Sequence, residues 1–184
     1  MIMKEMMPKD FIKTVLINEV GEIASTHPYI SFATMAIGIE FLGKCLNSQE
    51  KWNTTGQSKD DFELAVNRLN SLSPYRPLLL NNKLWDSLRN GFSHSFVPKT
   101  PITLSSKDEA EHLVETKPGR MNLKCENFYE DFKNACQEVI DMHFNSGKMT
   151  KPLIEVPDTN STTTPNNQSS VQINNIQTSG STNN

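Results

Sequence analysis

Residues 89–94 carry side chains whose types and spacing could move protons and bind an oxyanion. The pKa of an unperturbed histidine is about 6.5, so His94 can accept or donate a proton near neutral pH. Arg89 keeps its charge and offers a planar fork of donors that fits phosphate oxygens. Asn90 can orient a phosphate or His94 without titrating. We predict that Arg89, Asn90 and His94 are catalytic, with Ser93 as a possible supporting residue.

The spacing of Arg89 and His94 constrains how they could act together. Five steps along an α-helix turn the chain by about 500° and advance it by about 7.5 Å, so the two side chains point roughly 140° apart. Either the helix unwinds near Gly91, or two protomers each contribute to one cleft. The structural alternative is that Arg89 caps a helix end and His94 packs beneath the following loop.

Glu40 is a second possible supporting residue, because it interrupts an apolar segment. A buried carboxylate needs a partner, and Arg89 is one candidate, while surface placement at the helix end is the alternative. Residues 38–45 also come close to a phosphate-binding loop. Cys45 stands where that loop requires a Ser or Thr hydroxyl, and the segment continues a helical pattern, so we expect Gly38 and Gly43 to ease helix packing instead.

Apolar residues recur at helical spacing in five stretches, which predicts a mainly α fold. We expect these helices at about residues 11–23, 28–46, 58–69, 78–92 and 126–144, the second being central and buried. Between the last two, residues 101–125 contain short alternating runs separated by polar turns. These runs predict a small antiparallel β insertion.

Composition bounds the domain and its setting. Of the 184 residues, 36% are apolar, and 18 Lys and Arg against 21 Asp and Glu give a formal charge of −3, which argues against a broad basic surface. We expect one domain over 1–157, because 21 of the 27 residues in 158–184 are Ser, Thr, Asn or Gln and predict a disordered tail. Three cysteines without paired spacing, no signal peptide and no sufficiently long apolar run predict a cytoplasmic chain that does not enter a membrane.

The pattern Arg89-Asn90-x3-His94, at the end of an apolar helix, resembles the Arg-x4–6-His motif of HEPN (higher eukaryote and prokaryote nucleotide-binding) domains. The resemblance covers roughly residues 10–145. It implies an up-and-down bundle of four to five helices, in agreement with the helices expected above. It also implies paired motifs that meet at a two-fold interface, and therefore a homodimer.

The resemblance further implies metal-independent RNA cleavage, in a toxin or antiviral defence setting. The neighbouring 2′-hydroxyl would attack the phosphate, leaving a 2′,3′-cyclic phosphate and a 5′-hydroxyl. On this reading the partners are RNA, a second protomer and an antitoxin or regulatory protein, with no cofactor and no metal. The alternative is a non-catalytic HEPN-fold module that binds nucleotides or a protein, with Arg89 as an anion anchor.

Overall fold

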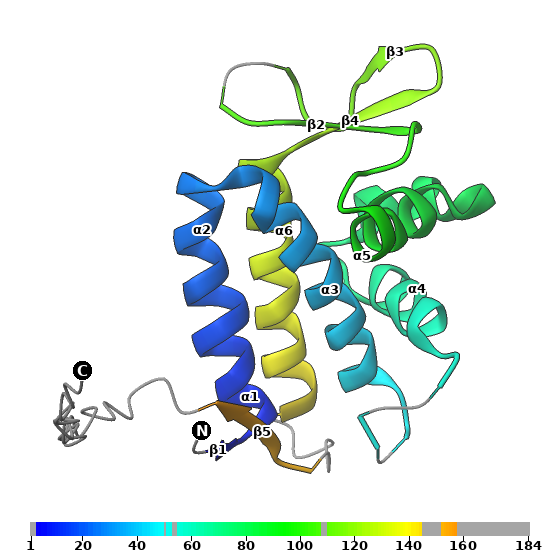
Figure 1. Cartoon of the computed structure of the whole chain (residues 1–184). Helices are drawn as coiled ribbons and strands as arrows, with labels where there is room; N and C mark the ends of the chain where they lie inside the picture. Colours follow the sequence, from blue (N-terminus) through cyan, green and yellow to red (C-terminus); the bar gives the residue numbers. More distant parts are fainter. Residues whose placement is uncertain (1–2, 50, 53–54, 108–109, 145–151, 158–184) are drawn as a thin grey trace, which may run out of the picture.

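A computed structural model describes residues 3–49, 51–52, 55–107, 110–144 and 152–157. The fold is mainly α, as predicted, and Figure 1 shows the helices side by side with small sheets at both ends. The helical elements in chain order are α1 (Pro8–Phe11), η1 (Ile12–Glu19), α2 (Val20–Thr26), α3 (Pro28–Leu46), α4 (Ser58–Arg68), η2 (Ser73–Asn82), η3 (Trp85–Asn90), α5 (Gly91–Ser95), α6 (Cys125–Val139) and η4 (Ile140–Phe144).

Helix α3 is the centre of the bundle, in agreement with its predicted burial. It packs against α2, α4 and α6, which surround it on several sides (Figure 1). Its buried side chains include Phe32, Met35 and Ile39, and Phe32 stacks on Phe128 of α6 with ring centroids 5.7 Å apart. An amphipathic helix is stable mainly through such packing, so the apolar periodicity explains why these segments are helical.

Two glycines of α3 permit this close packing, as the sequence predicted. A Cβ on Gly38 would lie 2.5 Å from the ring of Phe132, and a Cβ on Gly43 would overlap the backbone carbonyl of Asp61. The segment that resembled a phosphate-binding loop is therefore a helix–helix contact.

The fourth predicted helix begins later than expected. Residues 73–82 form a 3₁₀-helix with a kink, because Asn81 adopts a left-handed backbone conformation with φ of 58°. Helical structure resumes at Lys83 and continues to Ser95. Pro74 and Pro77 lack backbone N–H donors, so neither can contribute a donor to a longer α-helix.

The predicted β insertion is present, with one difference in strand direction. Strands β2 (Ile102–Ser105), β3 (Glu115–Lys117) and β4 (Arg120–Lys124) form a sheet in the order β2-β4-β3. The expected antiparallel pairing joins β3 to β4, whereas β2 runs parallel to β4. A direct hairpin between neighbouring strands needs a loop of about 2–5 residues. Nine residues separate β2 from β3, so β2 and β3 need not be neighbours, and β4 lies between them.

A second, two-stranded sheet joins the ends of the described chain and was not predicted. Strand β1 (Met3–Met6) pairs antiparallel with β5 (Ile154–Pro157), with Glu5 opposite Glu155. Each strand has only four residues, too few to show a clear alternation. The expected tail over 158–184 lies outside the described residues.

Helix α3 is long and apolar enough to cross a membrane by length and composition, contrary to the expectation that no segment is. The apolar pattern continues past Glu40 to Leu46, so a window of 18 residues in this helix reaches a mean hydropathy of 1.3. In this structure α3 is the core helix, and 56% of that window is buried inside the protein.

Candidate functional site

Arg89 is held by Glu40 at the junction of η3 and α3. Its Nε and Nη2 atoms both lie 2.6 Å from Glu40 Oε2, and the Glu40 side chain is 5% exposed. The guanidinium also lies over the ring of Trp85, with Cζ 5.0 Å from the ring centroid. Of the two alternatives for Glu40, the structure therefore shows the buried partner of Arg89 and not a surface carboxylate.

Lys44 is a second cation on the same carboxylate. Its Nζ lies 2.9 Å from Glu40 Oε1, so the two carboxylate oxygens serve different cations. One negative and two positive charges leave this cluster of Glu40, Lys44 and Arg89 with a net charge of +1. Arg89 is 20% exposed, and its Nη1 has no partner among the described residues. The cluster can therefore still attract an anion from solution.

The helix that carries the motif does not unwind at Gly91, which has helical φ and ψ of −56° and −50°. The hydrogen bonding of η3 is of the π type, and it returns to the α type at Gly91. The segment after the helix folds back across it: a Cβ on Gly91 would lie 2.8 Å from the Val97 carbonyl oxygen, and Lys99 N–H donates to the Ser87 carbonyl at 3.0 Å. The structure therefore does not provide the first of the two routes that could bring Arg89 and His94 together, and contribution from two protomers stays a prediction.

His94 lies on the exposed side of α5, apart from the Arg89 ion pair. Ser93 is also exposed, and Asn90 is half-buried. Within the part of the chain that the structure describes, the side chains of Asn90, Ser93 and His94 form no hydrogen bond or ion pair. A single chain thus brings Arg89 to Glu40 but does not bring it to His94. His94 is also not packed beneath the following loop, contrary to the structural alternative.

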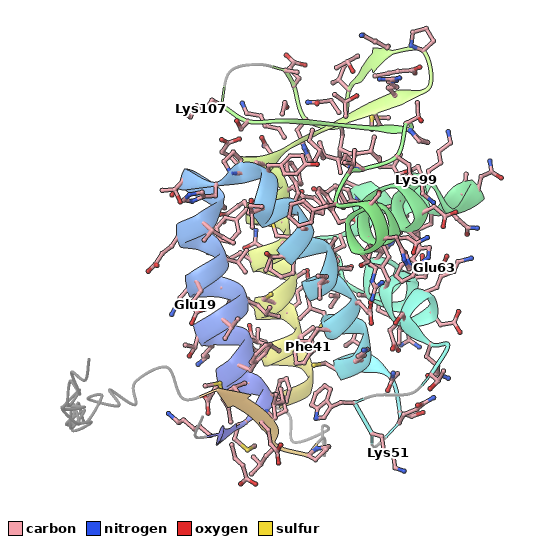
Figure 2. All side chains as sticks on the ribbon, in the orientation of Figure 1. Glu19, Phe41, Lys51, Glu63, Lys99 and Lys107 are labelled. Carbon is pink, nitrogen blue, oxygen red and sulfur yellow. The ribbon has the colours of Figure 1, made fainter. Side chains whose placement is uncertain are left out.

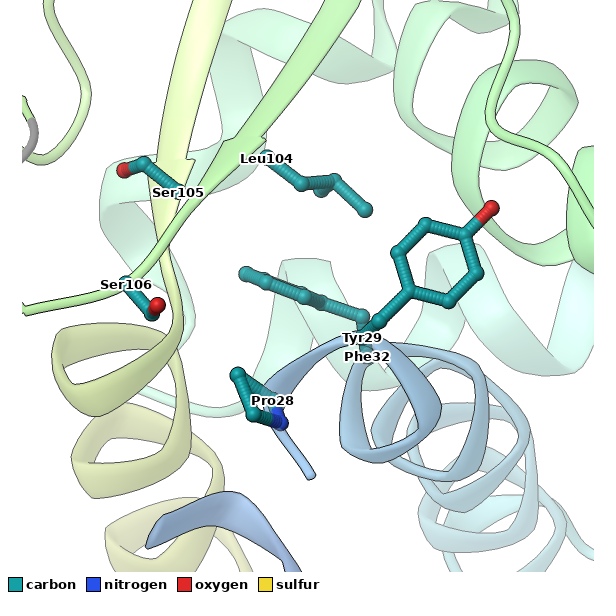
Figure 3. A pocket seen from close by; sticks show the side chains of 6 residues that line it. All are labelled: Pro28, Tyr29, Phe32, Leu104, Ser105 and Ser106. Carbon is teal, nitrogen blue, oxygen red and sulfur yellow. The ribbon is translucent and has the colours of Figure 1, made fainter. Parts of the chain in front are cut away.

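The helix over residues 83–95 carries Arg89 and His94, and we call it the motif helix. Aromatic side chains attach it to the start of α3. The Tyr29 hydroxyl donates to the Phe96 carbonyl at 2.7 Å, and its ring lies 5.4 Å from that of Phe92. Tyr29 also borders a pocket of about 130 Å³, where Figure 3 shows Pro28, Tyr29 and Phe32 of α3 on one side and Leu104, Ser105 and Ser106 on the other. The pocket therefore lies between the β insertion and the start of α3, and Tyr29 connects it to the motif helix.

An apolar surface lies beside these contacts. We call it the α3 face and define it by four side chains that are 41–55% exposed: Tyr29, Ile30, Ile37 and Phe96. Ile30 and Ile37 are seven residues apart and therefore share one side of the helix. Glu40, the partner of Arg89, lies three residues beyond Ile37 on the same helix.

A second polar cluster, which the sequence did not predict, joins the β insertion to the bundle. Lys124 N–H donates to His112 Nδ1 at 2.9 Å, so Nε2 of the neutral imidazole carries the proton and donates to Tyr75 Oη, also at 2.9 Å. Tyr75 in turn donates to Asp131 Oδ2 at 2.6 Å. Burial raises the pKa of Tyr75, and Asp131 raises it further, while burial lowers the pKa of His112.

Sequence signals existed for some of these residues only. Trp85 lies four positions before Arg89, which it contacts, and Lys44 lies four positions after Glu40, which it contacts. Residues at i and i+4 meet on a helix, so the spacing indicated both contacts. Tyr75 lies in η2, His112 in the turn before β3 and Asp131 in α6, with no fixed spacing to indicate that they meet.

Over the described residues, no group of three or more His, Cys, Asp or Glu side chains could hold a metal ion. Comparison of the chain with protein-family models, with curated proteins and with solved structures found no match. The chemistry of the site therefore has to be inferred from its own geometry.

Proposed function

We propose that this protein is a HEPN-like RNA endonuclease that acts as a homodimer. The observation that carries the proposal is an exposed histidine on the same helix as an arginine whose ion-pair cluster has an excess positive charge. RNA supplies its own nucleophile in the 2′-hydroxyl, so the protein has to move protons and stabilise negative charge on the phosphate. Those are the tasks for which imidazole and guanidinium groups are suited.

The proposed reaction is an internal transfer that leaves the RNA in two fragments. The 2′-oxygen bonds to phosphorus as the bond from phosphorus to the 5′-oxygen breaks. His94 takes the 2′-hydroxyl proton, a water molecule gives a proton to the leaving 5′-oxygen, and His94 then returns its proton to the resulting hydroxide. Arg89 stabilises the added charge on the phosphate, and Asn90 orients it. The products are a 2′,3′-cyclic phosphate and a 5′-hydroxyl.

The α3 face supports a second copy of this chain as the partner. Four large apolar side chains that are 41–55% exposed form a surface of the kind that marks protein contacts. A homodimer that buries this face would bring two motif helices close to one another. We therefore propose Ile37 as an interface residue, and expect Ile37→Glu to yield monomers in analytical ultracentrifugation and to lose cleavage.

The test of catalysis is cleavage of a defined RNA in EDTA by purified protein. His94→Ala should abolish cleavage and leave RNA affinity within a few-fold, because the imidazole acts on protons and not on ground-state charge. His27→Ala is the matched control, since His27 is also an exposed histidine but lies at the junction of α2 and α3. Wild-type cleavage that persists in His94→Ala would refute the catalytic role.

Mixing two inactive variants tests whether the site is shared. Arg89→Met protomers mixed with His94→Ala protomers form heterodimers in which one of two shared sites is intact. If each site takes Arg89 from one chain and His94 from the other, about a quarter of wild-type activity should return after random exchange. No recovery, despite heterodimers detected by mass spectrometry, would contradict the shared site.

The Glu40–Arg89 pair favours a second candidate function, a non-catalytic HEPN-fold module that binds nucleotides, including those of RNA, or a protein. In that case Arg89 holds α3 to the motif helix and contacts a ligand only with its remaining donors. RNA binding without cleavage, lost in Arg89→Met and retained in His94→Ala, would support this candidate. The toxin or antiviral setting stays a proposal from the family resemblance, and slowed growth of an expressing host, relieved by His94→Ala, would support it.

A further inference from the structure

A pocket of about 330 Å³ lies at the end of the bundle where β5 crosses α1 and α3. It is lined by Phe11 of α1, Phe41 and Lys44 of α3, Trp52 of the following loop, and residues 153–155. Ligand pockets in proteins usually measure about 300–1,000 Å³, so this one suits a small molecule. In Figure 2 the labelled Phe41 marks its position, well separated from Lys99 near the motif helix.

Three aromatic rings, those of Phe11, Phe41 and Trp52, line one side of the pocket. Phe41 and Trp52 stack with ring centroids 5.1 Å apart and planes inclined by 11°, and Phe11 meets Phe41 at 5.0 Å. The Trp52 indole N–H donates to the Pro152 carbonyl at 3.1 Å, which fixes the ring against the chain that leads into β5. Offset stacking on rings held in place favours a planar aromatic ligand.

The charged residues of the pocket favour a ligand with a negative charge. Lys44 is 22% exposed, and it belongs to the cluster with Glu40 and Arg89 that has a net charge of +1. Glu155 also lines the pocket, but it is exposed, and water and salt screen an exposed charge more than a partly buried one. The partly buried positive charge therefore dominates, and an anionic group on the ligand would complete the neutralisation of the cluster.

We propose that this pocket binds a small planar aromatic molecule with a carboxylate or similar anionic group. The ring packs against the wall formed by Phe11, Phe41 and Trp52, and the anion contacts Lys44. The pocket shares the Glu40–Lys44–Arg89 cluster with the proposed RNA site, but its lining does not include Arg89 or His94, and its existence does not depend on RNA cleavage.

The experiment compares three probes that share one ring and differ in charge, by isothermal titration calorimetry on the full chain. The probes are indole-3-acetate, indole-3-acetamide and tryptamine, with charges of −1, 0 and +1 at pH 7. Indole-3-acetate should bind about tenfold more tightly than the acetamide, as expected for one charge-assisted contact, and tryptamine should bind most weakly. Equal affinities, a preference for tryptamine, or no binding of the acetate at millimolar concentration would overturn the proposal.

Variants then assign the contacts. Lys44→Met should reduce the preference for acetate over acetamide to near unity, whereas Lys44→Arg should keep it. Lys99→Met is the matched control, because it removes one positive charge far from the pocket and should leave all three affinities unchanged (Figure 2). Trp52→Ala should weaken all three probes alike. A preference that survives Lys44→Met would refute the role of Lys44. The ranking of probes on the wild-type chain tests the proposal even if a variant fails to fold.

Discussion

Two polar clusters join helices in this protein, and they differ in how completely their groups are satisfied. In the cluster of Tyr75, His112 and Asp131, every named donor has an acceptor, and the Tyr75 side chain is fully buried. In the cluster of Glu40, Lys44 and Arg89, two cations share one carboxylate, and both remain about one-fifth exposed. A closed network with matched donors and acceptors stabilises the fold, whereas an open cluster with excess charge can also engage a ligand.

The largest effect on stability should come from breaking the open cluster at its centre. Arg89→Met leaves buried Glu40 with Lys44 alone, and we expect a loss of about 2–3 kcal/mol in the free energy of unfolding. The double variant Glu40→Met with Arg89→Met should lose less than the sum of the two single variants, as measured by urea denaturation. Strict additivity would show that the pair is not coupled.

The closed cluster should respond more moderately to removal of one hydroxyl. Tyr75→Phe retains the ring packing but takes the donor from Asp131 and the acceptor from His112, so we expect a loss of about 1–2 kcal/mol in the free energy of unfolding. Because these residues join the β insertion to η2 and α6, amide exchange should accelerate in 110–124 more than in α3. Unchanged stability would indicate that water replaces the hydroxyl.

The closed cluster should also make the stability of the fold depend on pH through His112. Burial lowers the pKa of His112 below its usual value of about 6.5, although Asp131 opposes the shift. As the pH falls through about 6.5, the unfolded chain takes up this proton before the folded one, so stability declines from there down to the lower folded pKa. Protonation at Nδ1 would also break the bond from Lys124 N–H. His112→Gln should show a smaller decline between pH 7.5 and 5.5, and an equal decline would assign the effect to other groups.

How much of this could be predicted from the sequence depended on whether the residues involved were close in the chain. Helix periodicity predicted the buried central helix over 28–46 correctly, because the apolar pattern of a helix is local in the chain. The contact of Glu40 with Arg89 could be named as one alternative, because a buried carboxylate needs a partner. The parallel pairing of β2 with β4, and the pairing of β1 with β5, depend on contacts between distant segments that no local pattern encodes.

The smallest effect is expected at the edge of the open cluster. Lys44→Met leaves Glu40 paired with Arg89, so the carboxylate stays compensated, and a partly exposed i,i+4 ion pair contributes about 0.5 kcal/mol. The variant should therefore unfold at nearly the wild-type urea concentration at low salt, and the small difference should shrink in 1 M NaCl, where exposed charges are screened. A loss as large as that of Arg89→Met would mean that Glu40 depends equally on both cations.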